Sequence, residues 1–132
     1  MKKKTESYEI NLTEAEVKRS VEDYLKDLMK RGKLWYCRLN VGTFGRHHNI
    51  QGAPKGTADL IIIQPGEVHL EYMGEQHGPG IPVGFVTFIE LKSSDGKLRP
   101  EQKEFEDKVT KLNCRYAIVR SVEDLEEVLK RE

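Results

Sequence analysis

Three charged residues, Asp59, Glu90 and Lys92, interrupt segments that are otherwise apolar. On a strand, Glu90 and Lys92 project from the same face because they are two positions apart, while Leu91 faces the opposite side. If the strand of Asp59 pairs beside that of Glu90, two carboxylates converge on one point and can hold a hard divalent cation. A lysine beside such a cation can orient or deprotonate an attacking water, and the cation can neutralise charge that develops on a phosphate. The three residues therefore predict a phosphodiester hydrolase.

The residues that flank these three positions help to distinguish a catalytic role from the commoner structural role of such charged residues. Taken alone, Asp59 is typical of an acidic residue at the start of a strand. Glu90 and Lys92 alone are typical of a solvated ion pair on the edge of a sheet. Leu60–Ile63 follow Asp59 directly, and before Glu90 come Phe85, Val86, Phe88 and Ile89. Such apolar runs are typical of strands that are buried on both faces. We therefore expect neither acid at a sheet edge.

The elements that position these residues alternate between helix and strand. A helix is predicted from Thr13 to about Arg31, with Thr13 and Glu16 in the spacing of a capping box and Gly32 suited to end it. Strands are expected at 34–41, 58–63, 84–92 and 115–119, and helices at 100–112, opened by Pro100, and at 122–129. The pattern also allows a strand at 68–73, a Gly-rich, His-bearing loop at 42–56 and turns at 74–80 and 93–96. This order predicts an α/β sandwich, in which helices flank a central mixed sheet.

Length and composition set limits on the class of protein. At 132 residues the chain suits one hydrophobic core, so we expect a single domain over 1–132, with residues 1–10 as a flexible basic tail. Lys and Arg number 22 and Asp and Glu number 22, so nucleic-acid binding would need a local basic patch. Buried reduced thiols explain Cys37 and Cys114 at least as well as a disulfide does, and no apolar run approaches the roughly 18 residues of a membrane span. We expect a cytoplasmic protein.

Three segments in order carry a resemblance to a known family: Gly56–Ile61, Phe88–Lys92 and Gly96–Gln102. They resemble the PD-(D/E)xK nuclease superfamily and are most similar to its virus-type replication-repair branch, the VRR-NUC domain. The resemblance implies a restriction-endonuclease-like fold and a DNA endonuclease that uses one or two Mg²⁺ or Mn²⁺ ions. It also implies a role in phage biology or DNA repair, frequent homodimers and, in some members, action on branched DNA such as Holliday junctions.

The resemblance also implies a set of site residues. Asp59, Glu90 and the backbone carbonyl of Leu91 would hold the metal, and Lys92 would position the attacking water. Gln102, near the start of the second long helix, would line the site, although an ordinary solvated glutamine is about as common there.

The family further uses a glutamate from the first helix, for which three candidates exist. Glu16 is accounted for as the capping partner of Thr13, and Glu22 falls one position off the apolar stripe. Glu14 lies on the stripe line, where it should point inward and an unpaired carboxylate is costly unless it binds a cation. We therefore choose Glu14, with Glu22 as the alternative.

Basic and polar residues that could meet DNA phosphates gather mainly in the loop before Asp59. They are Arg38, Arg46, His47, His48, Lys55 and Lys97. A loop that is merely solvated would have a similar composition. The adjacent histidines could suggest a transition-metal site, but no further ligands stand at suitable spacing.

Two departures from the family pattern stand out. Ala58 replaces the proline that usually precedes the aspartate. This replacement makes the backbone less rigid but removes no metal ligand. Residues 65–83 are longer than the usual hairpin, and we interpret them as an insertion near the active face that could alter substrate choice. The rival functions are a nucleic-acid-binding or assembly domain that has lost catalysis, and a restriction-type or transposition-associated endonuclease with the same site.

Overall fold

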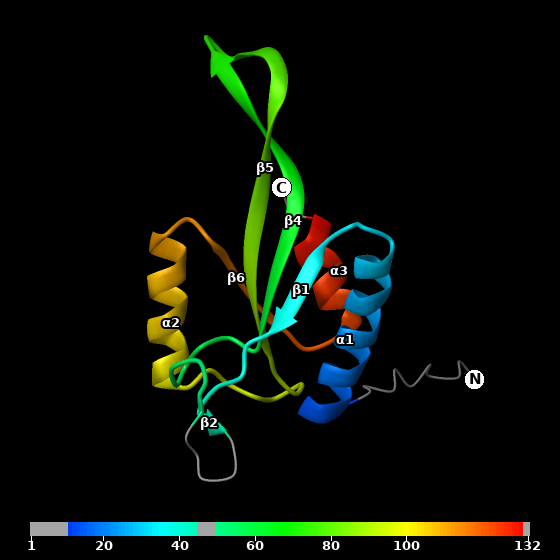
Figure 1. Cartoon of the computed structure of the whole chain (residues 1–132), viewed down its shortest axis with the longest axis vertical. Coiled ribbons are helices and arrows are strands. Elements are labelled where there is room, and N and C mark those ends of the chain that lie inside the picture. The colour runs from blue at the N-terminus through cyan, green and yellow to red at the C-terminus, as the bar shows by residue number, and fades with distance from the viewer. Residues whose placement is uncertain (1–10, 45–49, 131–132) are drawn as a thin grey trace, which may run out of the picture.

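The computed structural model describes residues 11–44 and 50–130, which form a mixed sheet with helices on both of its faces (Figure 1). Its elements are α1 (Glu14–Lys30), β1 (Trp35–Arg38), β2 (Thr43–Phe44), β3 (Ile50–Gln51), β4 (Leu60–Tyr72), β5 (Glu75–Leu91), α2 (Pro100–Lys111), β6 (Arg115–Val119) and α3 (Val122–Lys130). This is the predicted α/β architecture, and it is consistent with a restriction-endonuclease-like fold.

The helix α1 forms where the apolar stripe predicts it. The Thr13 side chain accepts a hydrogen bond from the backbone N–H of Glu16 at 3.2 Å, which caps the first turn. The helix ends just before Gly32, whose φ of 72° lies in the left-handed region that glycine adopts without strain. The stripe of α1 packs with α3 on one face of the sheet, in a core that includes Val17, Val21, Leu25, Leu60, Ile62, Ile89, Leu91, Val119 and Leu125.

The two strands that carry the candidate site lie at the centre of the sheet. Within the described residues the strand order is β1-β4-β5-β6, with β4 antiparallel to both β1 and β5, and β6 parallel to β5. The helix α2 makes the crossover from β5 to β6 and covers the second face, where Phe105 meets Phe88 and Tyr116. The expectation that neither acid lies at a sheet edge is confirmed, because each of their strands has a neighbour on both sides.

The region 65–83 differs from its prediction. We expected separate strands at 58–63 and 68–73, a turn at 74–80 and an insertion near the active face. Instead, β4 and β5 run on as one long hairpin whose register shifts once, between Val68 and Leu70. The hairpin turns at Met73 and Gly74, at the end of the strands opposite to Asp59 and Glu90 (Figure 1). The insertion therefore extends away from the candidate site, and that part of the prediction is wrong.

The segment expected to be a Gly-rich loop at 42–56 contains some pairing. Thr43–Phe44 and Ile50–Gln51 form a short antiparallel ladder, and Val41 makes an isolated bridge with Ala53. The expected tail at 1–10 and the predicted DNA contacts Arg46, His47 and His48 lie outside the described residues. Cys37 and Cys114 are both free thiols and half-buried. Among the described residues no helix is both long and apolar enough to cross a membrane.

Candidate active site

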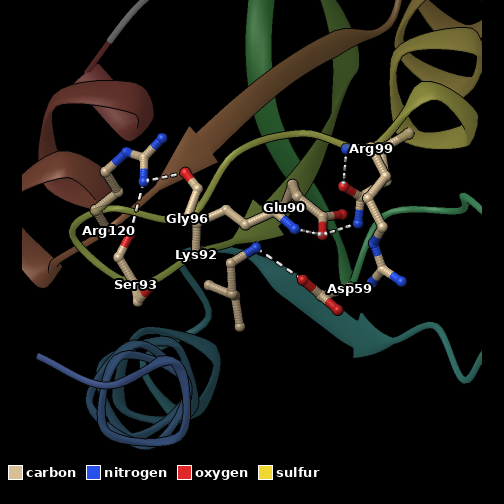
Figure 2. Close-up of polar contacts among 9 residues, drawn as sticks. Asp59, Glu90, Lys92, Ser93, Gly96, Arg99 and Arg120 are labelled. Carbon is tan, nitrogen blue, oxygen red and sulfur yellow. Dashed lines mark hydrogen bonds and ion pairs between the residues drawn. The ribbon is translucent and has the colours of Figure 1, made fainter.

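Asp59, Glu90 and Lys92 meet at one end of the central strand pair (Figure 2). Leu60 pairs with Ile89, so Asp59 and Glu90 stand opposite one another on antiparallel strands and project from the same face. The Lys92 Nζ atom lies 3.6 Å from Glu90 Oε1. Both side chains are deeply buried, since Glu90 is 2% and Lys92 7% exposed. The structure therefore brings these three predicted residues together, and their catalytic role stays a prediction.

Hydrogen bonds hold the two carboxylates in fixed positions. The backbone N–H of Leu91 donates to Asp59 Oδ2 at 2.7 Å. The Gln102 amide donates from Nε2 to Glu90 Oε1 at 2.8 Å, and its own Oε1 accepts from the backbone N–H of Arg99, also at 2.8 Å. Gln102 is thus a bridge between the first turn of α2 and the end of β5. Its placement beside Glu90 matches the expectation that it lines the site.

The surroundings disfavour the charged form of Glu90. Burial, and then the neighbouring Asp59 carboxylate, raise the pKa of Glu90 to about 7, with Lys92 acting in the opposite direction. Among the described residues, the buried Glu90 Oε2 has no hydrogen-bond partner. A buried carboxylate oxygen without a partner is costly, and a bound cation would remove that cost.

A divalent metal ion fits this donor set. Asp59 and Glu90 supply hard oxygen ligands, the end of β5 offers the Leu91 carbonyl, and Mg²⁺ commonly takes only one or two carboxylates and keeps several waters. Within the described part of the chain, no group of three or more His, Cys, Asp and Glu side chains gathers closely enough to hold a metal. An ion held by Asp59 and Glu90 would take its remaining ligands from water and from the Leu91 carbonyl.

The turn after β5 keeps Lys92 in place. The backbone N–H of Lys92 donates to Val119 O at 3.1 Å, which extends the β5–β6 ladder by one residue. The Arg120 guanidinium donates from one nitrogen to Ser93 O at 2.6 Å and to Gly96 O at 2.7 Å, so it closes the turn that follows (Figure 2). Arg120 was not predicted from the sequence, because its contacts with the turn depend on β6 lying beside β5.

A hollow of about 460 Å³ opens over the carboxylate pair. Asp59, Glu90, Leu91 and Gln102 lie along it together with Glu14, Lys18, Lys55, Gly56, Arg99 and Glu101. The first turns of α1 and α2 both contribute residues, and helix N-termini favour anionic ligands. The hollow therefore combines the carboxylate pair and two further acids, Glu14 and Glu101, with basic side chains and two helix starts.

Gly56, in the loop before Asp59, lies against the start of α2. Its φ is 93°, and a Cβ built on it would lie 2.4 Å from the Glu101 carbonyl oxygen. Only glycine allows the loop to lie this close to the start of α2. This close approach fixes the loop that leads into Asp59 against the helix that carries Gln102.

The burial of Glu14 and Glu22, the two candidate glutamates of α1, differs from the prediction. Glu14 lines the hollow, but its side chain is exposed, so the argument that it points inward is wrong. Its position at the start of α1, before the buried stripe begins at Val17, leaves it at the rim. Glu22, the alternative candidate, is 4% exposed and is held by Arg38 through two hydrogen bonds of 2.7 and 2.6 Å. A metal role for either residue stays a prediction.

The predicted DNA-contacting residues are dispersed. Arg38 is about half exposed and, besides its pair with Glu22, lines a smaller hollow next to Asp59 and Lys18. Lys55 lies at the rim of the main hollow and forms an ion pair of 3.0 Å with Glu101. Lys97 is exposed on the segment between β5 and α2 and does not line the main hollow.

Two basic residues at the hollow, Lys18 and Arg99, were missed from the sequence. A signal existed for each of them. Lys18 follows Glu14 by four positions and so shares its helix face, and Arg99 lies inside the Gly96–Gln102 motif directly before Pro100. Both were hidden among the 22 basic residues of a chain with no net charge.

Comparisons with known proteins agree with this geometry. A family model described as the VRR-NUC domain matches residues 18–123, which include Asp59, Glu90, Lys92 and Gln102 but not Glu14. Searches of the curated proteins and of the solved structures gave no match. Because the family model covers most of the sequence, the chain belongs to the VRR-NUC family of the PD-(D/E)xK nuclease superfamily.

Proposed function

We propose that this protein is a metal-dependent DNA endonuclease, in which Asp59, Glu90 and the Leu91 carbonyl hold Mg²⁺ or Mn²⁺. One observation carries the proposal. Two carboxylates face each other at the ends of central strands, and Glu90, with its partnerless Oε2 and a pKa raised to about 7, is disfavoured as a charged group unless a cation binds. Family membership supports nuclease chemistry in general, and this pair supports the metal dependence.

The residues around the pair have separable roles in phosphodiester hydrolysis. A bound divalent ion would supply Lewis-acid stabilisation of charge on the phosphate. Lys92, which reaches Glu90 from the adjacent turn, orients the attacking water and takes part in moving its proton. Gln102 holds Glu90 and is itself held by the backbone of Arg99, so it keeps the carboxylate at a fixed angle.

Basic groups at the rim of the hollow account for binding of the DNA backbone. Lys18, Lys55 and Arg99 line the hollow, and Arg38 lies in the adjoining one. Such residues contact phosphates rather than bases, so they fix the position of the strand without selecting a sequence. A Holliday junction, a flap and a plain duplex all present this backbone. We therefore propose DNA as the class of substrate, and a cleavage assay measures any preference for branched DNA.

A thermal-shift titration tests the metal site. Mg²⁺ or Mn²⁺ should raise the melting temperature, since an ion at 100 times its Kd stabilises the folded state by about 2.7 kcal/mol. Asp59→Asn should abolish this rise, whereas Glu104→Gln, which changes an exposed acid of α2, should keep it. A rise of parental size in Asp59→Asn would remove Asp59 from the metal site. The absence of any rise in the parent would favour the rival interpretation as a binding domain that has lost catalysis.

A further inference from the structure

The helix α1 and the strand β1 are joined by a buried ion pair. Glu22 of α1 is 4% exposed, and both of its carboxylate oxygens accept hydrogen bonds from Arg38. Arg38 donates from Nε at 2.7 Å and from one terminal nitrogen at 2.6 Å, which is a bidentate geometry that fixes the plane of the guanidinium. The Arg38 side chain itself is about half exposed. The pair therefore has a buried acidic half and an accessible basic half.

The accessible half of Arg38 keeps free donors. A guanidinium has five N–H donors and Glu22 takes two of them, so three remain. Arg38 lines a small hollow of about 180 Å³, whereas Glu22 lines neither this hollow nor the larger one over Asp59 and Glu90. The other residues along the small hollow are Lys18, Leu39, Asn40, Val41 and Asp59. A ligand in the small hollow would thus meet the guanidinium and not the carboxylate that holds it.

The small hollow adjoins the candidate active site. Lys18, Val41 and Asp59 line both hollows, so the two are continuous. The strand β1 ends at Arg38 beside β4, and β5 with Glu90 follows on the other side of β4. Neighbouring strands lie about 4.8 Å apart, which puts the end of β1 roughly 7 Å from the point between Asp59 and Glu90. One nucleotide of a DNA strand can span this distance.

Lys18 supplies the charge that the Glu22–Arg38 pair lacks. Glu22 cancels the charge of Arg38, so the pair contributes directed hydrogen bonds and little net field. Lys18 precedes Glu22 by four positions and shares its side of α1. Its ammonium group attracts an anion as a point charge, while the fixed guanidinium orients it. This combination suits a phosphate group.

The same contacts disfavour Glu22 as a metal ligand. Both of its oxygens already accept from Arg38, and its side chain is 5% exposed. A guanidinium in direct contact would also repel a divalent cation. The buried acid of α1 is therefore suited to hold Arg38, and the metal is left to Asp59 and Glu90.

We propose that Glu22 is a positioning residue, which holds Arg38 so that Arg38 and Lys18 bind the phosphate next to the one that is cleaved. This inference rests on the proposed endonuclease function. The scissile phosphate lies over Asp59 and Glu90, and its neighbour on the same strand lies in the small hollow. Because the guanidinium is fixed before DNA binds, little side-chain entropy is lost on binding, and the strand is aligned with the metal site.

Glu22→Gln separates positioning from simple electrostatics. The change removes a negative charge near the DNA path, so an electrostatic role alone would give tighter binding and no loss of cleavage. If Glu22 positions Arg38, single-turnover cleavage at saturating DNA should fall by roughly 10-fold or more, since the strand is no longer aligned. The rise in melting temperature with Mg²⁺ should stay at the parental size, because the metal ligands are intact.

A second arginine–carboxylate pair on α1 provides matched controls. Arg31 lies 2.8 Å from Asp27, and this exposed pair lines neither hollow. Asp27→Asn changes the same charge as Glu22→Gln but should leave cleavage within about twofold of the parent. Arg31→Gln is the corresponding control for Arg38→Gln.

DNA binding in EDTA tests the phosphate contact without cleavage. Arg38→Gln should weaken binding of a labelled duplex by roughly 3- to 10-fold and lower the slope of log affinity against log salt by about 1, whereas Arg31→Gln should change neither. Arg38→Lys keeps the charge but cannot pair bidentately, so it should keep the slope and still lower cleavage by roughly 10-fold. Because Arg38→Gln leaves Glu22 buried without its partner, the double variant Glu22→Gln/Arg38→Gln is measured beside it.

Several outcomes would overturn the proposal. Parental cleavage by Glu22→Gln, or an equal loss in Asp27→Asn, would remove the positioning role. Loss of the metal-induced rise in Glu22→Gln would make Glu22 a metal ligand instead. A parent that cleaves no DNA contradicts the proposed function, and the affinity measurements then still decide about the phosphate contact: equal salt slopes for Arg38→Gln, its double variant and Arg31→Gln would exclude it.

Discussion

The two ends of the β4–β5 pair show opposite distributions of charge. At one end, the Glu90 carboxylate and the Lys92 ammonium group are buried beside the half-buried Asp59, where the two central strands meet. At the far end of the hairpin, residues 64–83 (the arm), Leu70 and Tyr72 are largely exposed, and within the described residues neither β1 nor β6 extends alongside this part of β4 and β5. Ordinary folding favours the reverse, with charges in water and apolar side chains inside. Each end therefore carries a free-energy cost that a ligand or a partner can remove.

The charged residues at one end and the exposed apolar residues at the other differ in how many contacts hold them in place. The buried charges are fixed by hydrogen bonds from Leu91 and Gln102 and by the turn that Arg120 closes. At the other end, Leu70 and Tyr72 are largely exposed, and the Tyr72 ring and backbone carbonyl contact only the neighbouring His77 among the contacts found in the described residues. The difference shows that the fold holds the side chains at the Asp59–Glu90 end in fixed positions and leaves the apolar side chains at the other end exposed.

The largest expected effect is on catalysis and comes from Lys92→Ala. The change should lower single-turnover DNA cleavage by about 100-fold or more, because it removes the group that orients water while Asp59 and Glu90 remain. DNA affinity and the metal-induced rise in melting temperature should stay near those of the parent. Unchanged cleavage would contradict the role assigned to Lys92, and weakened binding with intact turnover would assign it to phosphate contact instead.

A second prediction compares two apolar residues of the same strand. Ile62 is fully buried beneath α1 and α3, so Ile62→Ala should lower the free energy of unfolding by about 2–5 kcal/mol. Leu70→Ala on the arm should change the stability of the monomer by less than about 0.5 kcal/mol. Chemical denaturation of dilute protein measures both values. Comparable losses at the two positions would mean that Leu70 is packed within the protomer.

The pH dependence of stability provides a third test. Folding raises the pKa of Glu90 to about 7, above its value in the unfolded chain. In the metal-free protein, the contribution of Glu90 to the free energy of unfolding is therefore fully present at low pH and is lost as the pH rises from about 4.5 to about 7. The loss should reach up to about 3 kcal/mol and be absent in Glu90→Gln. The gain from Mg²⁺ should increase over the same interval, since the ion competes with the proton. Parallel pH profiles for the parent and Glu90→Gln would contradict this origin.

The smallest expected effect comes from removing most of the arm. Gly66 pairs with Val83, so residues 67–82 can be replaced by an Asn-Gly turn that closes the hairpin. The metal response and the single-strand nicking rate of the shortened protein should stay within about twofold of the parent, because distant sites act independently. A large loss of nicking would show that the arm takes part in the active site.

Local patterns in the sequence were enough to predict the helices, the central strands and the Asp59–Glu90–Lys92 cluster. The apolar runs around both acids required central strands, and the i, i+2 spacing placed Glu90 and Lys92 on one face. The arm could not be predicted in this way, since proline and glycine at 78–82 indicate a turn. In the structure, Ile81 and Pro82 pair with β4, and Gly78–Gly80 form an irregularity within the hairpin and not its turn. Arg120, Lys18 and the Glu22–Arg38 pair depend on which elements become neighbours, which local spacing does not determine.

The most direct test of the account is cleavage of a panel of labelled branched and linear DNAs by the purified parent and Glu90→Gln. With Mg²⁺ or Mn²⁺ the parent should cut at least one of these DNAs, and cutting should cease in EDTA and in Glu90→Gln, which keeps the shape of the side chain and removes its charge. Absence of cleavage in either metal, or equal cleavage by the parent and Glu90→Gln, would contradict the assignment of Asp59, Glu90 and Lys92 as the active site.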